Sequence, residues 1–311
     1  MQLKIVTYRE LESKDSLLPL LDHAFRWPFN QRSFDQTAKM DPRLKNGPVG
    51  FCAVEDNHVI GYVGVMDLTT RTLDGAVECV GGLYGVATLP SHVRQGISTV
   101  LINRAHQHFE EKNYLFSLLG TSRTLVAHSL YEKLGYADLL EIPSAYKIIK
   151  AKGAVSAQKR KAAKLDLERI LRLYIDHVKG KTGLTVRSKA HVRMLKRAEG
   201  LKAKECIIGE DGYVLFKHIQ DTWVNGVWIR ELVALNTNEM SSLLDLVEGK
   251  AKDLVYDRAV LDSRLLQVYR SRGYITQKRS HSVLMIKPLK HARSFSQTYG
   301  DEFYVAGLDF F

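Results

Sequence analysis

Residues 83–136 read LYGVATLPSHVRQGISTVLINRAHQHFEEKNYLFSLLGTSRTLVAHSLYEKLGY, and this stretch decides the fold. The apolar run at 83–89 predicts a short strand that ends at Pro90. A loop containing Gly96 follows, and apolar residues then recur at steps of three and four from Ile97, which predicts an amphipathic helix. The unpaired N–H groups and the dipole at a helix start favour an anion, and glycine lets the backbone approach it. The loop is therefore a candidate phosphate site.

The second half of the stretch repeats the same order of elements. Residues 116–122 predict a buried strand, and apolar residues at helical spacing follow it as far as a glycine stop at Gly135. A single glycine is a weak signal, and the loop alone fits an ordinary strand–helix turn. The order of strand, loop, helix, strand and helix gives the phosphate interpretation its weight.

Two motifs in this stretch resemble the GNAT superfamily of acyl-CoA-dependent N-acyltransferases. The first is Val-x-x-x-Pro-x-x-x-Arg-x-Gly, which ends at Gly96, and the second is Leu-Tyr-Glu-Lys-Leu-Gly-Tyr at 130–136. They lie at the spacing that the superfamily shows. The resemblance implies an α/β (α+β) fold, in which a mixed, mostly antiparallel sheet is flanked by helices. It also implies a cleft for acetyl-CoA where two strands part.

The second half of the chain echoes the first. Gly61-Tyr62-Val63 is matched by Gly212-Tyr213-Val214, and the Tyr-x-x-x-Gly-Tyr motif at Tyr131 is matched at Tyr269. In place of the glycine loop, the second copy carries Glu239, which would repel a pyrophosphate. We therefore expect a degenerate repeat without an anion site. The expected domains are a catalytic domain at 1–150, a basic linker at 151–164, a degenerate domain at 165–290 and an aromatic tail at 291–311.

Tandem copies of this kind resemble the enhanced intracellular survival family of acetyltransferases. That resemblance covers roughly residues 1–290 and implies an active first copy and an inactive second one. That family carries a third, sterol-carrier-like domain, and the segment after Pro288 is too short for one. The substrates and the oligomeric state of that family therefore do not transfer to this chain.

The resemblance also implies where the cofactor binds. The backbone of Val86, Ala87 and Thr88 is expected to pair with pantetheine, and the amides of the loop and helix start to contact the pyrophosphate. The residues implied for this second contact are Arg94, Gln95, Gly96, Ile97, Ser98 and Thr99.

The loop departs from the superfamily pattern, Gln/Arg-x-x-Gly-x-Gly/Ala, in two ways. The basic side chain has moved to Arg94, and Ser98 replaces the last small residue. Thr124 stands where many relatives have asparagine on the CoA arm. Backbone amides supply most of such binding, so we expect the site to tolerate these changes.

Tyr131 matches the position of the superfamily's general acid. An ordinary tyrosine pKa of about 10 exceeds a thiol pKa of about 8.5, so the phenol is a weak donor to the leaving thiolate unless water is excluded. The alternative is a core aromatic residue at helical spacing. The motif around Tyr131 contains no Cys–His or Ser–His–Asp pattern for a covalent intermediate.

Two groups are candidates for the base. Glu78 lies on the strand that leads to the motif, where relatives often carry a carboxylate. The second candidate is the carboxylate of Phe311, because a terminal phenylalanine carboxylate enters the active site in the resembling family. His92 and His128 are expected to be surface residues.

The tail from residue 291 is unusually apolar for a chain end. It either fills a groove on the second domain or brings Phe311 to the acceptor, between the two domains. Its apolar residues are Phe295, Tyr299, Phe303, Tyr304, Val305, Leu308, Phe310 and Phe311.

The composition limits the cellular compartment and the binding partners that we expect for this protein. Of the residues 45% are apolar and 25% charged, and no apolar run is long enough for a membrane span. The N-terminal residues lack an export signal, and three isolated cysteines fit neither a disulfide framework nor a metal site, so a cytoplasmic protein without a metal is expected. The formal charge of +11 suits a polyanionic cofactor.

The expected function is acetyl transfer from acetyl-CoA, in one ternary complex, to the amine of a small molecule or peptide. One alternative is a CoA-binding sensor or scaffold that has lost catalysis. Another is a nucleic-acid-associated protein that uses the basic stretch 147–164, in which seven Lys or Arg occur with no acid, although a solvated linker explains the same charges. The sequence does not determine the acceptor, the acyl length or whether the chain forms a homo-oligomer.

Overall fold

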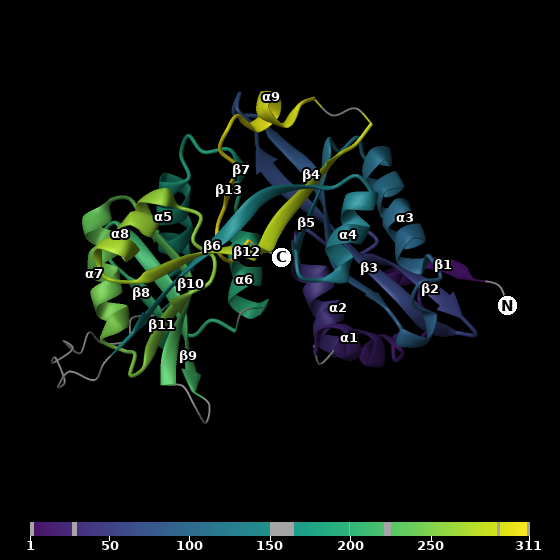
Figure 1. The fold of residues 1–311 in the computed structure, drawn as a ribbon, viewed down its shortest axis with the longest axis horizontal. Coiled ribbons are helices and arrows are strands. Elements are labelled where there is room, and N and C mark those ends of the chain that lie inside the picture. Colours follow the sequence, from purple (N-terminus) through teal and green to yellow (C-terminus); the bar gives the residue numbers. More distant parts are fainter. Residues whose placement is uncertain are drawn as a thin grey trace. The chain divides into compact units, whose positions relative to one another are not determined.

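The computed structural model describes residues 3–26, 30–149, 165–198, 200–220, 225–290 and 293–309. The chain forms two compact units (Figure 1). The first unit contains the residues up to Leu140 together with Val283–Gly300, and the second contains Glu141–Ser282 together with Asp301–Phe310. Within the described ranges, no helix has the length and apolarity needed to cross a bilayer.

The first unit is built on a mixed, mostly antiparallel sheet. Its strands, in order across the sheet, are β1 (Lys4–Thr7), β2 (Gly50–Glu55), β3 (His58–Arg71), β4 (Val77–Thr88), β5 (Phe116–Ser122) and the end of β12 (Ile275–Pro288). The pairs from β1 to β4 are antiparallel, and β4 and β5 are parallel. The β2–β3 hairpin turns at Asp56 and Asn57, whose positive φ angles of 47° and 64° suit a tight two-residue turn.

Helices cover the sheet of the first unit. They are α1 (Leu17–Phe25), α2 (Gln31–Met40), α3 (Ile97–Glu111), α4 (Val126–Lys133) and α9 (Phe295–Tyr299), with 3₁₀ turns η1 (Tyr8–Glu10) and η2 (Pro90–His92). Buried residues of α3 and α4, including Leu101, Phe109 and Tyr131, form one core with Leu83 and Leu119. Gly61 lets α3 lie directly on β3, because a Cβ there would meet Ile97 Cγ2 at 2.6 Å.

The second unit repeats this plan. Its strands, in order, are β6 (Ala137–Ile148), β11 (Leu254–Asp257), β10 (Asn225–Ala234), β9 (Gly212–Gln220) and β8 (Cys206–Ile208). One core packs α7 (Thr237–Glu248) and α8 (Ser263–Ser271) on this sheet, and another packs α5 (Leu167–His177) and α6 (Lys189–Ala198). The short pieces are η3 (Ala203–Glu205), β7 (Gly183–Leu184) and β13 (Tyr304–Val305).

The pairing registers confirm that the fold is repeated. Gly61 pairs with Thr88 in the first unit as Gly212 pairs with Ala234 in the second. Each of these hairpins has a bulge in its later strand, at Gly85–Val86 in β4 and at Arg230 in β10. Each later strand also pairs in parallel with a strand on its other side, β5 or β11. The predicted α/β class with two similar domains is therefore correct.

The division of the chain differs from the predicted boundaries at 150 and 165. The first unit ends at Leu140, within β6, and takes in Val283–Gly300, so each half of the chain contributes a segment to the other unit. Val283 and Met285 are fully buried in the core of the first unit. Alternating apolar residues show that a strand is buried but do not show in which sheet, so the exchange leaves no local signal. The predicted linker at 151–164 lies outside the described residues.

Candidate active site

In the first unit, β4 and β5 pair for only three residues. Gly81, Gly82 and Leu83 face Ser117, Leu118 and Leu119, and beyond these pairs the two described strands run on without pairing. On its other side, β4 stays paired with β3 as far as Thr88, through the bulge at Gly85, where φ is +59°. The backbone of 84–88 therefore has one ladder edge unoccupied by β5. Val86, Ala87 and Thr88 lie where the predicted pairing with pantetheine requires them.

The loop after β4 leads into an uncapped helix. Arg94 and Gly96 have φ angles of +63° and +78°, and Gly96 is the N-cap residue of α3. No side chain caps this helix start, and a Cβ at Gly96 would meet nothing within 4 Å. Arg94, Gln95 and Gly96 are exposed, while Ile97 is buried and anchors the helix. The first N–H groups of a 15-residue helix thus begin at an open surface, which suits an anion.

Side-chain contacts fix the loop to the sheet. Ser98 Oγ lies 2.8 Å from Thr88 Oγ1, which ties the helix start to the end of β4. His92 Nε2 lies 3.0 Å from Glu55 Oε2, and Nδ1 of the same ring lies 2.8 Å from Ser91 Oγ. Ser98, a departure from the superfamily pattern, therefore has a structural role that a smaller residue could not fill.

Two neighbouring tyrosines differ in what their hydroxyl groups bind. The Tyr136 hydroxyl lies 2.9 Å from His106 Nε2 and 2.6 Å from Ser117 Oγ, deep in the core. Tyr131 packs edge-on against Tyr136, with 6.0 Å between ring centroids, and its hydroxyl has no hydrogen-bond partner among the residues that the structure describes. Burial raises the pKa of Tyr131 to about 12, so the phenol is protonated at neutral pH. Tyr131 is therefore a protonated donor whose hydroxyl has no acceptor among the described residues.

The structure does not bring Glu78 to Tyr131. Glu78 lines a cavity at the other end of β4, with Asp74, Arg293 and Gln297 among its neighbours. The five residue-to-residue steps from Glu78 to Leu83 correspond to about 17 Å of extended strand. Phe311 lies outside the described residues.

The remaining candidates lie around the turn before α4. Thr124 is exposed, and its hydroxyl lies 2.8 Å from Ser122 Oγ, within the turn itself. His128 was expected at the surface, but it is 9% exposed and its Nε2 lies 2.9 Å from Asp138 Oδ1. The expectation for His128 was wrong because its helix turns this face towards the start of β6.

A polar cluster beside the bulge was not predicted from the sequence. The Tyr84 hydroxyl donates to the carbonyl oxygen of Val49 at 2.9 Å, and the Tyr62 hydroxyl donates to the Tyr84 hydroxyl at 3.1 Å. Val49 itself has a φ angle of +69°, which is strained for a β-branched residue. Gly50 and Gly64 were the available signals, since a Cβ at either would collide with one of the two tyrosine rings at 2.5 Å.

The corresponding positions of the second unit are occupied. Asn236 caps α7 by accepting from the Glu239 N–H at 2.8 Å, so this helix start holds its own side-chain acceptor. The carboxylate of Glu239 lies in the same first turn. The hydroxyl of Tyr269, the counterpart of Tyr131, donates to Asp257 Oδ2 at 2.8 Å. The uncapped helix and the unpaired tyrosine are therefore features of the first unit alone among the described residues.

The match to a known protein family also lies in the first unit. Residues 14–136 match the acetyltransferase (GNAT) family model. No curated protein sequence matches the chain. Over nearly its whole length the chain is similar in fold to three solved structures, at sequence identities that show the fold alone.

These structures are GCN5-related N-acetyltransferases from Kribbella flavida and Anabaena variabilis, and Eis1 from Mycobacterium abscessus. The Kribbella protein has a TM-score of 0.65 and 18% identity, over 92% of this chain and 71% of that one. The Anabaena protein has a TM-score of 0.60 and 18% identity, over 92% and 72%. Eis1 has a TM-score of 0.58 and 16% identity, over 90% and 73%.

Substitution of Gly96 by glutamate is expected to weaken CoA binding by about tenfold or more, because a carboxylate would stand at the positive helix start. Gly96→Gln is the matched control, since it imposes the same strain at positive φ without the charge. Isothermal titration calorimetry with CoA measures both. Equal losses of CoA affinity in the two variants would show that the size or backbone strain of the new side chain weakens binding, not its charge. In that case no anion binds at Gly96.

The second unit supplies a further control for the same experiment. Asn238→Glu places a carboxylate on an exposed position in the first turn of α7 and is expected to leave CoA affinity unchanged. Met240, two residues further along, is unsuitable for this purpose because it is 1% exposed and a charge there would be buried.

Replacement of Tyr131 by phenylalanine removes only the hydroxyl. We expect kcat to fall by about 100-fold, in the range of general acid catalysis, with CoA affinity and melting temperature nearly unchanged. Tyr136→Phe is the control, because it leaves His106 and Ser117 without their partner and should lower stability by about 1–3 kcal/mol. An unchanged rate in Tyr131→Phe would make Tyr131 a packing residue only.

Proposed function

We propose that the first unit, in which residues 14–136 match the acetyltransferase (GNAT) family model, transfers an acetyl group from acetyl-CoA directly to an amine. The acceptor amine belongs to a small molecule or a peptide. The observation that carries this proposal is the uncapped start of α3 beside the point where β4 and β5 stop pairing. The second unit, in which the corresponding helix start is capped, serves as a non-catalytic partner domain.

The proposed cofactor position follows from these two features. The pyrophosphate accepts hydrogen bonds from the N–H groups of 94–99, where the helix dipole and the absence of a cap favour it. Pantetheine lies along the open edge of β4 at Val86–Thr88, where it supplies the pairing that β5 no longer gives. The thioester then lies near the bulge, and the formal charge of +11 helps to attract the polyanion.

The proposed reaction needs no covalent enzyme intermediate. The free amine attacks the thioester carbonyl, a C–N bond forms, and the C–S bond breaks as the tetrahedral intermediate collapses. A base removes the ammonium proton, and Tyr131 gives its proton to the departing thiolate. Burial raises the pKa of this phenol to about 12, which keeps it protonated at neutral pH but also makes it a weaker acid than a thiol, so the transfer requires that water is excluded.

The cysteines argue for direct transfer. An acyl-enzyme route through a cysteine would need a reactive thiolate. Burial raises the pKa of Cys52 to about 12 and that of Cys206 to about 12, and it also raises the pKa of Cys79. All three thiols are therefore protonated at neutral pH and are poor nucleophiles.

This difference gives a kinetic prediction. Initial rates measured over a grid of acetyl-CoA and amine concentrations should give intersecting double-reciprocal lines, as a ternary complex requires. Parallel lines, which indicate ping-pong kinetics, would contradict direct transfer. Calorimetry in the same buffer should give one CoA per chain, because among the described residues the start of α3 is uncapped and its counterpart in the second unit, the start of α7, is capped.

Two other functions remain as outcomes of this experiment. CoA binding without turnover against a panel of amines would favour the sensor or scaffold. Salt-dependent binding to DNA or RNA would favour a nucleic-acid partner, through a basic stretch that falls mostly outside the described residues.

We propose the Phe311 carboxylate as the base, as the resemblance suggests, in preference to Glu78. Glu78 lies in a cavity with Arg293 and is separated along β4 from the bulge. Deletion of residues 310–311, or addition of a few residues after them, is expected to lower turnover and spare CoA binding. Glu78→Gln is the matched control and should keep full turnover; if it loses turnover instead, the base is Glu78.

A further inference from the structure

The loop proposed to hold the pyrophosphate forms an ion pair with the neighbouring hairpin. His92 Nε2 lies 3.0 Å from Glu55 Oε2, and the two side chains are 22% and 25% exposed. Glu55 is the last residue of β2, and His92 is the last residue of η2, four positions before the N-cap residue of α3. A carboxylate therefore lies beside a loop whose other features suit an anion.

Backbone pairing keeps Glu55 close to this loop. Glu55 pairs with His58 at the end of the β2–β3 hairpin, and the Leu89 N–H donates to the Ile60 carbonyl at 2.9 Å. The end of the hairpin thus lies beside the end of β4, where the loop begins. Consecutive Cα atoms are about 3.8 Å apart, so the Cα of His92 lies within about 7 Å of the residue two positions later, the first of 94–99.

The contacts of His92 suit both charge states of an imidazole. Its Nδ1 lies 2.8 Å from Ser91 Oγ, and a hydroxyl can either donate to this nitrogen or accept from it. The Nε2–H donates to the Glu55 carboxylate in both states. Histidine is the side chain whose charge changes between about pH 5 and pH 8. Loss of the proton therefore changes the net charge of the pair and keeps its hydrogen bonds.

The other charged residues around the pair are Arg94 in the same loop, and Asp56 and His58 in the β2–β3 turn. His58 is exposed, and its Nδ1 lies 2.8 Å from the Asp56 carbonyl oxygen. Among the described residues, Glu55 is the charged group that contacts the His92 ring. His92 is therefore the histidine here whose charge is paired with a carboxylate.

We infer that His92 is a positioning residue of the cofactor site that acts through Glu55: the charged imidazole neutralises this carboxylate, and the neutral imidazole leaves it to repel the pyrophosphate. The inference rests on the proposed function, because it needs the pyrophosphate at residues 94–99. The pair has no net charge while His92 is charged and one negative charge once it is neutral. Cofactor affinity therefore falls as the pH rises, and by linkage the binding of the cofactor takes up a proton.

Electrostatics gives the size of the effect. A single charge about 8 Å from the two charges of a pyrophosphate changes the affinity by about fivefold in water. In 1 M salt the screening length falls to about 3 Å, so most of this difference should disappear. A pair that only anchored the loop would show neither the pH dependence nor the salt dependence.

Dephospho-CoA is the probe for the first experiment, because it keeps the pyrophosphate and lacks the 3′-phosphate, whose own charge changes near pH 6. Isothermal titration calorimetry at low salt should give a dissociation constant about fivefold weaker at pH 8 than at pH 6. In 1 M salt the two values should differ by less than about twofold. Equal affinities at the two pH values at low salt would overturn the inference.

Two conservative variants separate charge from anchoring. Glu55→Gln keeps an acceptor for His92 and removes the negative charge, so at pH 8 it should bind dephospho-CoA about fivefold more tightly than the unaltered chain. His92→Gln keeps a neutral donor for Glu55 and should show the weak affinity at both pH values. If Glu55→Gln binds no more tightly at pH 8, the pair is only a structural anchor.

His58→Asn is the matched control, because His58 is an exposed histidine of the adjoining turn whose ring contacts the Asp56 carbonyl. It should keep the pH dependence, and its loss in this variant would assign the effect to His58 and not to His92. Calorimetry at pH 7 in buffers of different ionisation enthalpy then counts the protons taken up. The unaltered chain should take up a fraction of a proton on binding dephospho-CoA, and His92→Gln none.

Failure of this inference and failure of the proposed function give different results. If dephospho-CoA binds with the expected pH dependence and no amine is acetylated, the role of His92 stands and the proposed reaction is wrong. If an amine is acetylated and binding does not depend on pH, the reaction stands and the role of His92 is wrong. If dephospho-CoA does not bind, the proposed cofactor site is wrong, and the inference fails with it.

Discussion

The structure depends on a parallel strand pair that is only three residues long. After Leu83 and Leu119, β4 keeps β3 as its partner but loses β5, so its backbone groups face one unfilled side. Buried N–H and C=O groups need partners, and a strand edge inside a sheet therefore calls for another extended molecule. The bulge at Gly85 turns the end of β4 at this point. The loop that follows then presents the uncapped start of α3 beside the same edge.

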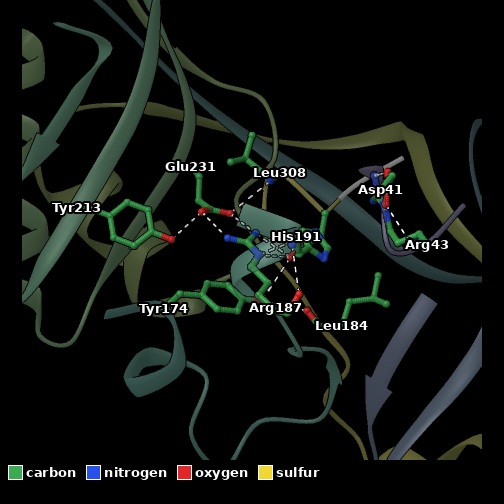
Figure 2. Close-up of polar contacts among 11 residues, drawn as sticks. Asp41, Arg43, Tyr174, Leu184, Arg187, His191, Tyr213, Glu231 and Leu308 are labelled. Carbon is green, nitrogen blue, oxygen red and sulfur yellow. Dashed lines mark hydrogen bonds and ion pairs between the residues drawn. The ribbon is translucent and has the colours of Figure 1, made fainter. Parts of the chain in front are cut away.

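In the second unit, another segment of the chain lies where the strands part. β10 and β11 also part after a short parallel pairing, and Gly307 approaches the carbonyl oxygens of Arg230 and Ala259. The registers make Tyr84 and Glu231 equivalent, since each follows the parallel pairs and pairs with the earlier strand of its hairpin. In the first unit Tyr62 binds the Tyr84 hydroxyl, and in the second its counterpart Tyr213 binds the Glu231 carboxylate. This position therefore belongs to a tyrosine pair in the first unit and, in the second, to an ionic cluster in which Arg187 binds Glu231 and Asp309 (Figure 2).

Much of this fold was predictable from local patterns, and the site only in part. The strand at Phe116–Ser122, the helix that starts at Ile97 and the repeated Gly-Tyr-Val and Tyr-x-x-x-Gly-Tyr motifs are short-range signals, and the structure bears them out. The inclusion of Val283–Gly300 in the first unit was not predictable, because the residue pattern of an apolar strand does not indicate which sheet the strand joins. The Arg187 cluster was hidden for a similar reason. Its carboxylates lie 44 and 122 residues away, and nothing local marks either as a partner.

The two units show why a repeat can lose a ligand without losing its fold. The cores around Leu101 and Phe109 in one unit, and around Leu244 and Tyr269 in the other, are made by helices that pack on the sheet. The strand divergence adds little to either core, so core packing alone does not require it to stay open. An apolar segment with one well-placed carboxylate can then fill it, as Ala306, Leu308 and Asp309 do. The physical requirement is only that the unpaired backbone groups of the open strand edge find partners. In one unit we propose that the occupant is a cofactor, and in the other it is the chain.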